Sequence, residues 1–207
     1  MKIKNVRCVQ VNTPLIEPGP NTKPGWNTHA IRSNPIARYP EFTRVDGHKP
    51  GTTKKAWVQI TAENGTFGLG SFAHGQIGAS LIDYFIAPLI EGKNALAIEL
   101  MNDLIWRSSE GFQGGIATAA QSGVDLALWD LKGKLLGRPV YELIGGPSRK
   151  AVELYATGDD LEWMKELGFK RFKISNPFFY EEGSEGLKKL EEHVAKSREI
   201  VGEDAEL

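Results

Sequence analysis

The sequence predicts an α+β fold followed by a short parallel α/β segment, and three observations lead to this expectation. Residues 55–73 form two strand-like runs joined through Asn64-Gly65, a dipeptide that favours a tight hairpin turn. Residues 77–143 carry apolar side chains at helical spacing, interrupted by Gly, Pro and Asn. Beyond residue 150, strand and helix patterns alternate with short connections, which is typical of parallel strands covered by helices.

The first region is expected to hold one sheet and three helices. Residues 3–11 alternate apolar and polar side chains, so together with the hairpin they predict a three-stranded antiparallel meander. The helices are expected at residues 78–92, 94–109 and 114–137. The third helix is rich in alanine and glycine, which permits close approach of a neighbouring helix, and Gly137 marks its end.

The second region has the pattern strand, helix, strand, helix. Strands are expected at residues 151–158 and 169–175, each followed by a helix, with the last helix at residues 187–201. The change of pattern predicts a domain boundary, with one domain at residues 1–149 and the start of a second at residues 150–207.

A long segment without periodicity, at about residues 12–54, lies between the first strand and the hairpin. It is rich in Pro, Gly, Asn and Thr, but it also carries Trp, Tyr and Phe interleaved with His and Arg. Loops of this length in a compact domain are generally either disordered or functional, and disordered segments hold few aromatic residues. The composition therefore favours a working lid over a floppy insertion.

Composition and charge exclude several classes of protein. The chain has 207 residues, of which 41% are hydrophobic and 25% charged, with a formal net charge of −1. This charge gives no attraction to nucleic acid or to an anionic membrane surface. No apolar run reaches the roughly 18 residues of a membrane span, and the start lacks the apolar stretch of a signal peptide, so a cytoplasmic protein is expected. The single cysteine, Cys8, is expected to be a small core residue.

A specific resemblance is carried by AAQSGVDLALWDLKGKLLGRPVYELIGG, residues 119–146. This stretch resembles the signature helix of the mandelate racemase and muconate lactonising branch of the enolase superfamily. The matching residues are Ala120, Ser122, Gly123, Val124, Asp125, Ala127, Leu128, Asp130, Gly133, Lys134, Pro139, Leu143 and Gly145. The stretches NPIARYPEF, AENGTFGLGSF and LYATG are most similar to the acid-sugar dehydratases of this branch, above all the rhamnonate dehydratases.

The resemblance implies an α+β capping domain followed by a TIM-type (β/α) barrel, with the active site at the carboxyl ends of the barrel strands. It also implies a Mg²⁺ ion, held by carboxylates, that stabilises the enediolate formed when a base removes the proton next to a sugar-acid carboxylate. In a dehydratase, loss of the 3-hydroxyl then leaves a 2-keto-3-deoxy acid. This chain holds the capping domain, the lid and about two βα units, so its barrel is incomplete.

Two aspartates of the signature helix also have a physical interpretation. Asp125 and Asp130 are five residues apart, so they do not share a helix face and are poor candidates for a paired acid and base. Asp130 lies four residues before Lys134, the spacing of a helical ion pair. Both are expected to be structural anchors between the cap helices and the barrel.

The sequence departs from the family pattern at the end of the second barrel strand. Many members carry Lys-x-Lys there, with the second lysine as a base, whereas this chain has Lys173 and then Ser175. A serine hydroxyl cannot remove a carbon-bound proton unaided, which counts against a racemase or cycloisomerase. The family's metal ligands belong to the third, fourth and fifth strands. No catalytic or metal-binding residue is therefore expected in this chain, and all are expected downstream of Leu207.

Three residues are candidates for substrate binding by resemblance. His29 and Arg44 are placed in the lid, where the dehydratases hold the sugar acid, and an arginine fork suits a carboxylate. Lys173 is placed at the strand end, where its cation can face the substrate carboxylate; an ordinary strand-end lysine is the alternative. His193, in the charged last helix, is expected to be solvated.

Three functions remain as hypotheses. The first is the N-terminal part of a Mg²⁺-dependent aldonate dehydratase, a lyase of carbohydrate metabolism that acts on a sugar acid and forms a homo-oligomer when complete. The second is a non-catalytic fragment or subunit whose barrel is completed by a partner chain. The third is a racemase or cycloisomerase of the same superfamily. Taken alone, the chain is expected to be inactive because it lacks the metal ligands.

Overall fold

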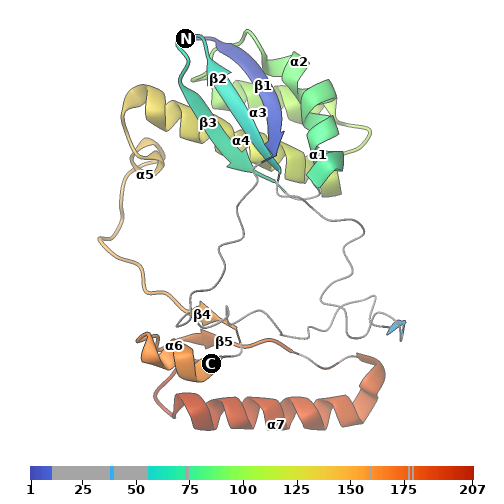
Figure 1. The fold of residues 1–207 in the computed structure, drawn as a ribbon, viewed down its shortest axis with the longest axis vertical. Helices are drawn as coiled ribbons and strands as arrows, with labels where there is room; N and C mark the ends of the chain where they lie inside the picture. Colours follow the sequence, from blue (N-terminus) through green and yellow to red (C-terminus); the bar gives the residue numbers. More distant parts are fainter. Residues whose placement is uncertain (11–37, 40–55, 73–74, 159, 177, 179) are drawn as a thin grey trace. The chain divides into compact units, whose positions relative to one another are not determined.

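The computed structural model describes residues 1–10, 38–39, 56–72, 75–158, 160–176, 178 and 180–207 (Figure 1). The chain divides into two compact units, which are described separately. Unit 1 contains the described residues up to Lys150 apart from 38–39, and unit 2 contains those from Ala151 onward. In the described part of the chain, no helix is both long enough and apolar enough to cross a membrane.

Unit 1 contains a three-stranded antiparallel sheet with the strand order β1-β2-β3, formed by β1 (Ile3–Gln10), β2 (Ala56–Ala62) and β3 (Phe67–Ser71). The central strand β2 pairs with both neighbours, and its Val58 stands opposite Gly70 of β3. The predicted meander is therefore confirmed.

The turn between β2 and β3 follows from Asn64 and Gly65. Gly65 has a φ of 86°, a left-handed conformation that glycine adopts without steric cost. The side-chain oxygen of Asn64 accepts a hydrogen bond from the N–H of Thr66 at 3.1 Å, and the N–H of Ala62 donates to the carbonyl of Thr66 at 2.8 Å. These bonds close the hairpin at the dipeptide that predicted it.

The helical segments of unit 1 follow the sheet in the chain. They are α1 (Gly75–Leu81), η3 (Ile82–Ile86), α2 (Ala87–Ile90), α3 (Ile98–Ser108), α4 (Gly115–Leu136) and α5 (Val140–Leu143). The single helix predicted at residues 78–92 is interrupted by η3, a π-helical turn in which the N–H of Ala87 donates to the carbonyl of Ile82. Pro88 explains the wider turn, because it has no N–H and its ring crowds the carbonyl four residues earlier.

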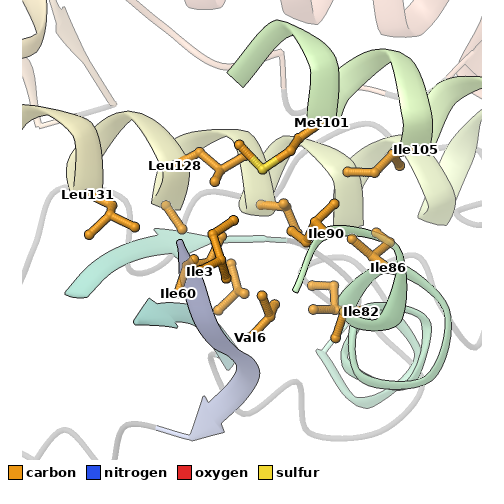
Figure 2. Packing of buried hydrophobic residues seen from close by; sticks show 14 of the residues in the cluster. Ile3, Val6, Ile60, Ile82, Ile86, Ile90, Met101, Ile105, Leu128 and Leu131 are labelled. Atoms are coloured by element: carbon orange, nitrogen blue, oxygen red, sulfur yellow. The ribbon is translucent and has the colours of Figure 1, made fainter. Parts of the chain in front are cut away.

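The core of unit 1 lies between the sheet and these helices (Figure 2). Every second residue of β2, from Ala56 to Ala62, is buried, as expected for a strand with one face on a core. Val58, Ile60 and Ala62 form one cluster with Met101 of α3 and with Leu128 and Leu131 of α4. The cluster fixes α3 and α4 on the same face of the sheet.

Glycines allow β3 to approach α4 closely. A Cβ atom on Gly70 would lie 1.9 Å from the carbonyl oxygen of Gly123, and one on Gly68 would lie 2.1 Å from that of Ala127. Side-chain carbons cannot come this close to backbone oxygens, so only glycine fits at these two strand positions. The small residues of α4, predicted to permit close approach of a helix, here accept strand β3 instead.

Side chains close both edges of this sheet. On β1, the N–H of Cys8 donates to the carboxylate of Asp83 at 2.8 Å, and the carboxylate of Glu91 accepts from the strand two residues earlier, also at 2.8 Å. On β3, the N–H of Leu69 donates to Oδ2 of Asp130 at 2.8 Å. Edge N–H groups that are already bonded are a poor template for another strand.

Unit 2 contains two short parallel strands, β4 (Ala156–Thr157) and β5 (Phe172–Lys173). Its helical segments are α6 (Leu161–Glu166), η4 (Tyr180–Glu182) and α7 (Gly183–Val201). The core consists of Ala156, Leu161, Met164, Phe172 and Val201. The strands are shorter than predicted, because they pair with each other over only two residues each. Helix α7 begins four residues earlier than predicted, because its first turn is polar and gives no apolar signal.

Candidate functional site

The candidate site is the carboxyl edge of the β4–β5 pair in unit 2. Thr157 and Lys173 stand opposite each other at the ends of these strands, and the N–H of Gly158 donates to the carbonyl of Lys173 at 3.0 Å. Neighbouring parallel strands present their carboxyl ends at the same edge of a sheet, where α/β folds assemble their sites. This edge is therefore where substrate-binding side chains would gather.

Lys173, one of the predicted substrate-binding residues, presents its cation at this edge. Its side chain is exposed, and Nζ has no ion-pair or hydrogen-bond partner among the described residues. An ammonium without a partner can bind the carboxylate of a small ligand through charge-assisted hydrogen bonds. The role of Lys173 in substrate binding stays a prediction.

The other two predicted substrate-binding residues, His29 and Arg44, lie outside the described residues. Almost all of the predicted lid, at about residues 12–54, lies outside them as well. The roles of His29 and Arg44 therefore stay predictions.

The loop after β5 is shaped by its own polar groups. Ser175 is half-buried, and Oδ1 of Asn176 accepts a hydrogen bond from the N–H of Phe178 at 3.0 Å. This bond forms a turn of the kind that asparagine favours. Farther along, Lys189 of α7 pairs with Glu182 of η4 at 2.9 Å, which ties the helix to the end of the loop.

His193 is not the solvated histidine that the charged helix predicted. Its Nε2 atom is inaccessible to solvent and has no hydrogen-bond partner among the described residues. Its ring meets that of Phe178 edge to face, with the centroids 6.2 Å apart. The prediction was wrong because the charge pattern of α7 does not reveal that Phe178, from the loop after β5, packs on this part of the helix.

The acidic residues at this edge do not form a metal site in the described part of the chain. Asp160, which follows β4, is the N-cap of α6, and its Oδ1 accepts a hydrogen bond from the N–H of Trp163 at 3.2 Å. Among the described residues, no group of three or more His, Cys, Asp or Glu side chains is placed to hold a metal ion. Mg²⁺ requires several oxygen ligands around one point, so these residues do not fit it.

Asp125 and Asp130 act as anchors within unit 1. Asp125 accepts a hydrogen bond from Nδ2 of Asn102 in α3 at 2.7 Å. Oδ2 of Asp130 accepts from the N–H of Leu69 at 2.8 Å and from Nζ of Lys134 at 2.6 Å. The predicted ion pair of Asp130 with Lys134 is confirmed, and the two aspartates join α4 to α3 and β3 of the cap itself.

Unit 1 also has a cavity of about 600 Å³ with a mainly apolar lining. It is lined by Trp57, Leu69, Gly70, Ser71, Leu126, Trp129, Asp130, Val140 and Ile144. Asp130 is the only titratable residue among these, and its Oδ2 is already bonded to Leu69 and Lys134. Ser71 is the lining residue with a hydroxyl, and none of the described lining residues is a histidine or lysine that could activate it, so the edge at Lys173 remains the candidate site.

The fold and this edge agree with a match to a known family. Residues 34–145, more than half of the chain, match the family described as mandelate racemase / muconate lactonizing enzyme, N-terminal domain. The chain therefore belongs to this family, as the resemblance of its long helix indicated.

Particular relatives of the chain are rhamnonate dehydratases. The chain is 34% identical over 207 residues to an L-rhamnonate dehydratase of Saccharopolyspora erythraea, a match that covers 99% of this chain and 53% of that protein. The crystal structure of L-rhamnonate dehydratase from Gibberella zeae matches with a TM-score of 0.85 and 29% identity, over 99% of this chain and 50% of that one. A structure of the Gibberella zeae enzyme complexed with Mg matches 97% of this chain and 50% of that one, with the same TM-score and identity.

An enzyme with a different reaction is similar as well. The 3,6-anhydro-D-galactonate cycloisomerase of Zobellia galactanivorans matches with a TM-score of 0.70 and 26% identity, over 99% of this chain and 49% of that one. The chain spans about half the length of the relatives that it matches. Family and fold are thus established, and the barrel is incomplete in this chain.

Proposed function

We propose that this chain is the N-terminal part of an acid-sugar dehydratase most similar to rhamnonate dehydratase. The observation that carries the proposal is the 34% identity to an L-rhamnonate dehydratase over 99% of the chain. Ser175 supports a dehydratase over a racemase or cycloisomerase, because it stands where many members of the superfamily carry a lysine base and its hydroxyl is no base for a carbon acid.

The proposed reaction converts a six-carbon aldonate to a 2-keto-3-deoxy acid. A base removes the proton from the carbon next to the carboxylate, and the electron pair moves onto the carboxylate oxygens to give an enediolate. The pair then forms a double bond between the second and third carbons, while the 3-hydroxyl takes a proton from an acid and leaves as water. The resulting enol then tautomerises to the keto acid. The base is proposed to lie in a part of the enzyme outside this chain.

Lys173 is proposed to bind the substrate carboxylate. As the neighbouring proton is removed, negative charge grows on the carboxylate oxygens, and an ammonium in contact with them stabilises this charge more than it stabilises the ground state. Arg44 and His29 of the lid are proposed to hold the sugar acid, the arginine through its planar fork.

Mg²⁺ is proposed as the cofactor of the complete enzyme, which the Mg-complexed structure of the Gibberella zeae relative supports. Its ligands are proposed to lie outside this chain, because the resemblance places them at the ends of the third, fourth and fifth barrel strands. Residues 1–149 are proposed as the capping domain and residues 150–207 as the start of the barrel domain. The complete enzyme is proposed to be a cytoplasmic homo-oligomer.

The test is turnover of six-carbon aldonates by the polypeptide purified from its natural source. Its intact mass, measured first under denaturing conditions, shows whether it is longer than this chain. Formation of the 2-keto-3-deoxy acid, followed as its semicarbazone, is expected to require a divalent metal ion and to stop with a chelator. Turnover that a chelator does not affect contradicts the mechanism.

A second candidate is a subunit that folds against a partner chain, and the short β4–β5 pair favours it. The two strands pair over only two residues each, and a parallel sheet of this size cannot close a barrel. A partner that carries the remaining strands would complete the sheet. Co-purification distinguishes the two candidates, because a stable monomer without a partner contradicts the subunit.

A further inference from the structure

Arg171 connects three segments of unit 2. Its Nη1 donates to the carboxylate of Glu153, which precedes β4, and its Nε pairs with Oε2 of Glu206 at 2.8 Å. Arg171 itself stands one residue before β5. Hydrogen bonds from the guanidinium to Glu153 and then to Glu206 raise the pKa of Arg171, so this residue keeps its charge throughout the working pH range.

Glu206 is already paired with this strand. The N–H of Phe172 donates to the carbonyl of Glu206 at 2.8 Å, and the N–H of Glu206 donates to the carbonyl of Lys170 at 3.1 Å. Arg171 and Glu206 form an isolated parallel bridge. Two backbone bonds that flank one residue in this way are the pattern of a parallel ladder. The segment around Glu206 is therefore the start of a third parallel strand beside β5.

The ion pairs of Arg171 lie on the same side of the sheet as Lys173. Successive side chains of a strand point to opposite faces, so Arg171 and Lys173 share one face and Phe172 has the other. Phe172 is only 5% exposed, in the core of unit 2, whereas Lys173 is exposed. The ion pairs of Arg171 thus lie on the face of the sheet that presents Lys173, the candidate ligand of the substrate.

The pattern of side chains alone does not fix the register of this third strand. A strand that slips by two residues keeps the same side chains on the same face. Asp204, two residues before Glu206, would then stand opposite Arg171 and offer it a carboxylate. Asp204 has a shorter side chain than Glu206, so its carboxylate reaches less far toward the guanidinium. The guanidinium between Glu153 and Glu206 therefore favours the observed register, together with Ala205, which packs against the core of unit 2 and would be replaced there by Glu203 after a slip.

We propose that Arg171 is a positioning residue that sets the register of the third parallel strand against β5. A slip by two residues would place Glu206 opposite Lys173, which lies two residues farther along the same face, and would pair its cation. The consequence for substrate binding rests on the proposed function, whereas the role in register does not.

The test compares amide hydrogen exchange, measured by NMR on the 207-residue chain, between the unsubstituted protein and Arg171→Met. Methionine keeps an apolar stem but removes the charge and the fork. The amides of Phe172 and Glu206 are expected to exchange at least about tenfold faster, with loss of the interstrand NOE between these residues. The amides of Ala156 and Gly158 donate to the backbone carbonyls of Arg171 and Lys173, which the substitution keeps, so their exchange is expected to change by less than about twofold.

Three further variants separate the effect of the Arg171 guanidinium, which bridges two carboxylates, from general effects of charge or folding. Arg171→Lys keeps the charge but cannot bridge two carboxylates, so its exchange rates are expected between those of the unsubstituted protein and Arg171→Met. Arg138→Met removes an ion pair with Glu142 at 3.2 Å in unit 1 and is expected to change neither amide. If Arg171→Met also exposes the Ala156 amide, then Glu206→Gln, which keeps an acceptor and loses only the charge, carries the test with the same measurement.

Unchanged exchange and NOEs at Phe172 and Glu206 in Arg171→Met, with Ala156 still protected, would overturn the role in register. If Arg171→Met disturbs the whole unit, unchanged exchange and NOEs in Glu206→Gln would overturn the role of Arg171 in register instead. The measurement needs no substrate and no turnover. Absence of dehydratase activity in the complete enzyme would therefore contradict the proposed function and leave the result for Arg171 standing.

Discussion

The carboxylate of Asp130 accepts a hydrogen bond from the N–H of Leu69 at 2.8 Å, across 61 residues of sequence. The same oxygen accepts from Nζ of Lys134 at 2.6 Å, and this Nζ also donates to the carbonyl of Phe67 at 3.0 Å. One turn of α4 thus satisfies a donor and an acceptor on the free edge of β3. These residues of the family's signature helix hold the capping domain together.

Removal of the Asp130 carboxylate is expected to destabilise unit 1. Asp130→Ala leaves the N–H of Leu69 without its acceptor and is expected to lower the free energy of unfolding by roughly 1–3 kcal/mol. Asp130→Asn keeps an acceptor and is expected to cost about 1 kcal/mol or less, because the pair with Lys134 is partly exposed and contributes little. Urea denaturation followed by circular dichroism measures both.

Asp103→Ala is the matched control for this prediction. It removes an exposed carboxylate that pairs with Arg107 at 2.9 Å at the same i, i+4 spacing, and is expected to cost less than about 0.5 kcal/mol. Equal losses in Asp130→Ala and Asp103→Ala would show that the bond to Leu69 does not stabilise the cap.

A methyl group on β3 is expected to separate this strand from α4. In Gly70→Ala the new Cβ would lie 1.9 Å from the carbonyl oxygen of Gly123, and the backbone on both sides would have to move. The expected loss is about 3 kcal/mol of unfolding free energy. Gly111→Ala, where nothing lies within 4 Å of the new atom, is expected to change stability by less than about 0.5 kcal/mol. A similar small effect at Gly70 would contradict the close packing of β3 on α4.

Local signals in the sequence predict the local structure of the cap. Asn64-Gly65 predicts the hairpin because the dipeptide itself favours the turn, and Gly137 ends α4 in a left-handed conformation with a φ of 63°. The π-helical turn η3 was not predicted, because the apolar spacing around it fits an unbroken helix as well. Only the local effect of Pro88 on the hydrogen bonds distinguishes the two.

The candidate site is only partly predictable for a different reason. Lys173 is found from its place at the end of a strand pattern, which is local information. The contacts of Arg171 with Glu153 and Glu206, by contrast, join segments 18 residues apart or more, and they depend on the register between strands. Asp204 and Glu206 could each stand opposite Arg171. Residue spacing and composition therefore do not reveal which of the two registers the strands adopt.

The thiol of Cys8 is expected to be unreactive in the folded chain. Burial raises the pKa of Cys8 to about 12, and the nearby carboxylate of Asp83 adds to the shift. At about pH 8 almost no thiolate is present, so alkylation by iodoacetamide is expected to be at least about 100-fold slower than for the unfolded chain. Asp83→Asn is expected to lower the pKa without restoring the ordinary value of 9.0, because burial is the larger cause. Mass spectrometry of the alkylated protein measures the rate.

The same shift gives stability a pH dependence. The thiol of the unfolded chain titrates at about 9.0, whereas that of the folded chain keeps its proton up to about 12. The folded state binds more protons between these values, so the contribution of Cys8 is fully present below pH 9.0 and is lost as the pH rises toward 12. Cys8→Ala is expected to make the decline of the urea midpoint in this range less steep. An identical decline in both proteins would contradict the raised pKa.

Loss of the cation at Lys173 is expected to affect substrate binding and not folding. Lys173→Met is expected to lower kcat/KM of the complete enzyme by roughly 10- to 100-fold, because a hydrogen bond to a charged group contributes about 1.5–3 kcal/mol. Its unfolding free energy is expected to change by less than about 0.5 kcal/mol, since the side chain is exposed. Lys170→Met is the matched control, because Lys170 is also exposed but lies on the opposite side of the strand. A loss of kcat/KM in Lys173→Met no larger than in Lys170→Met would show that Lys173 does not bind the substrate carboxylate.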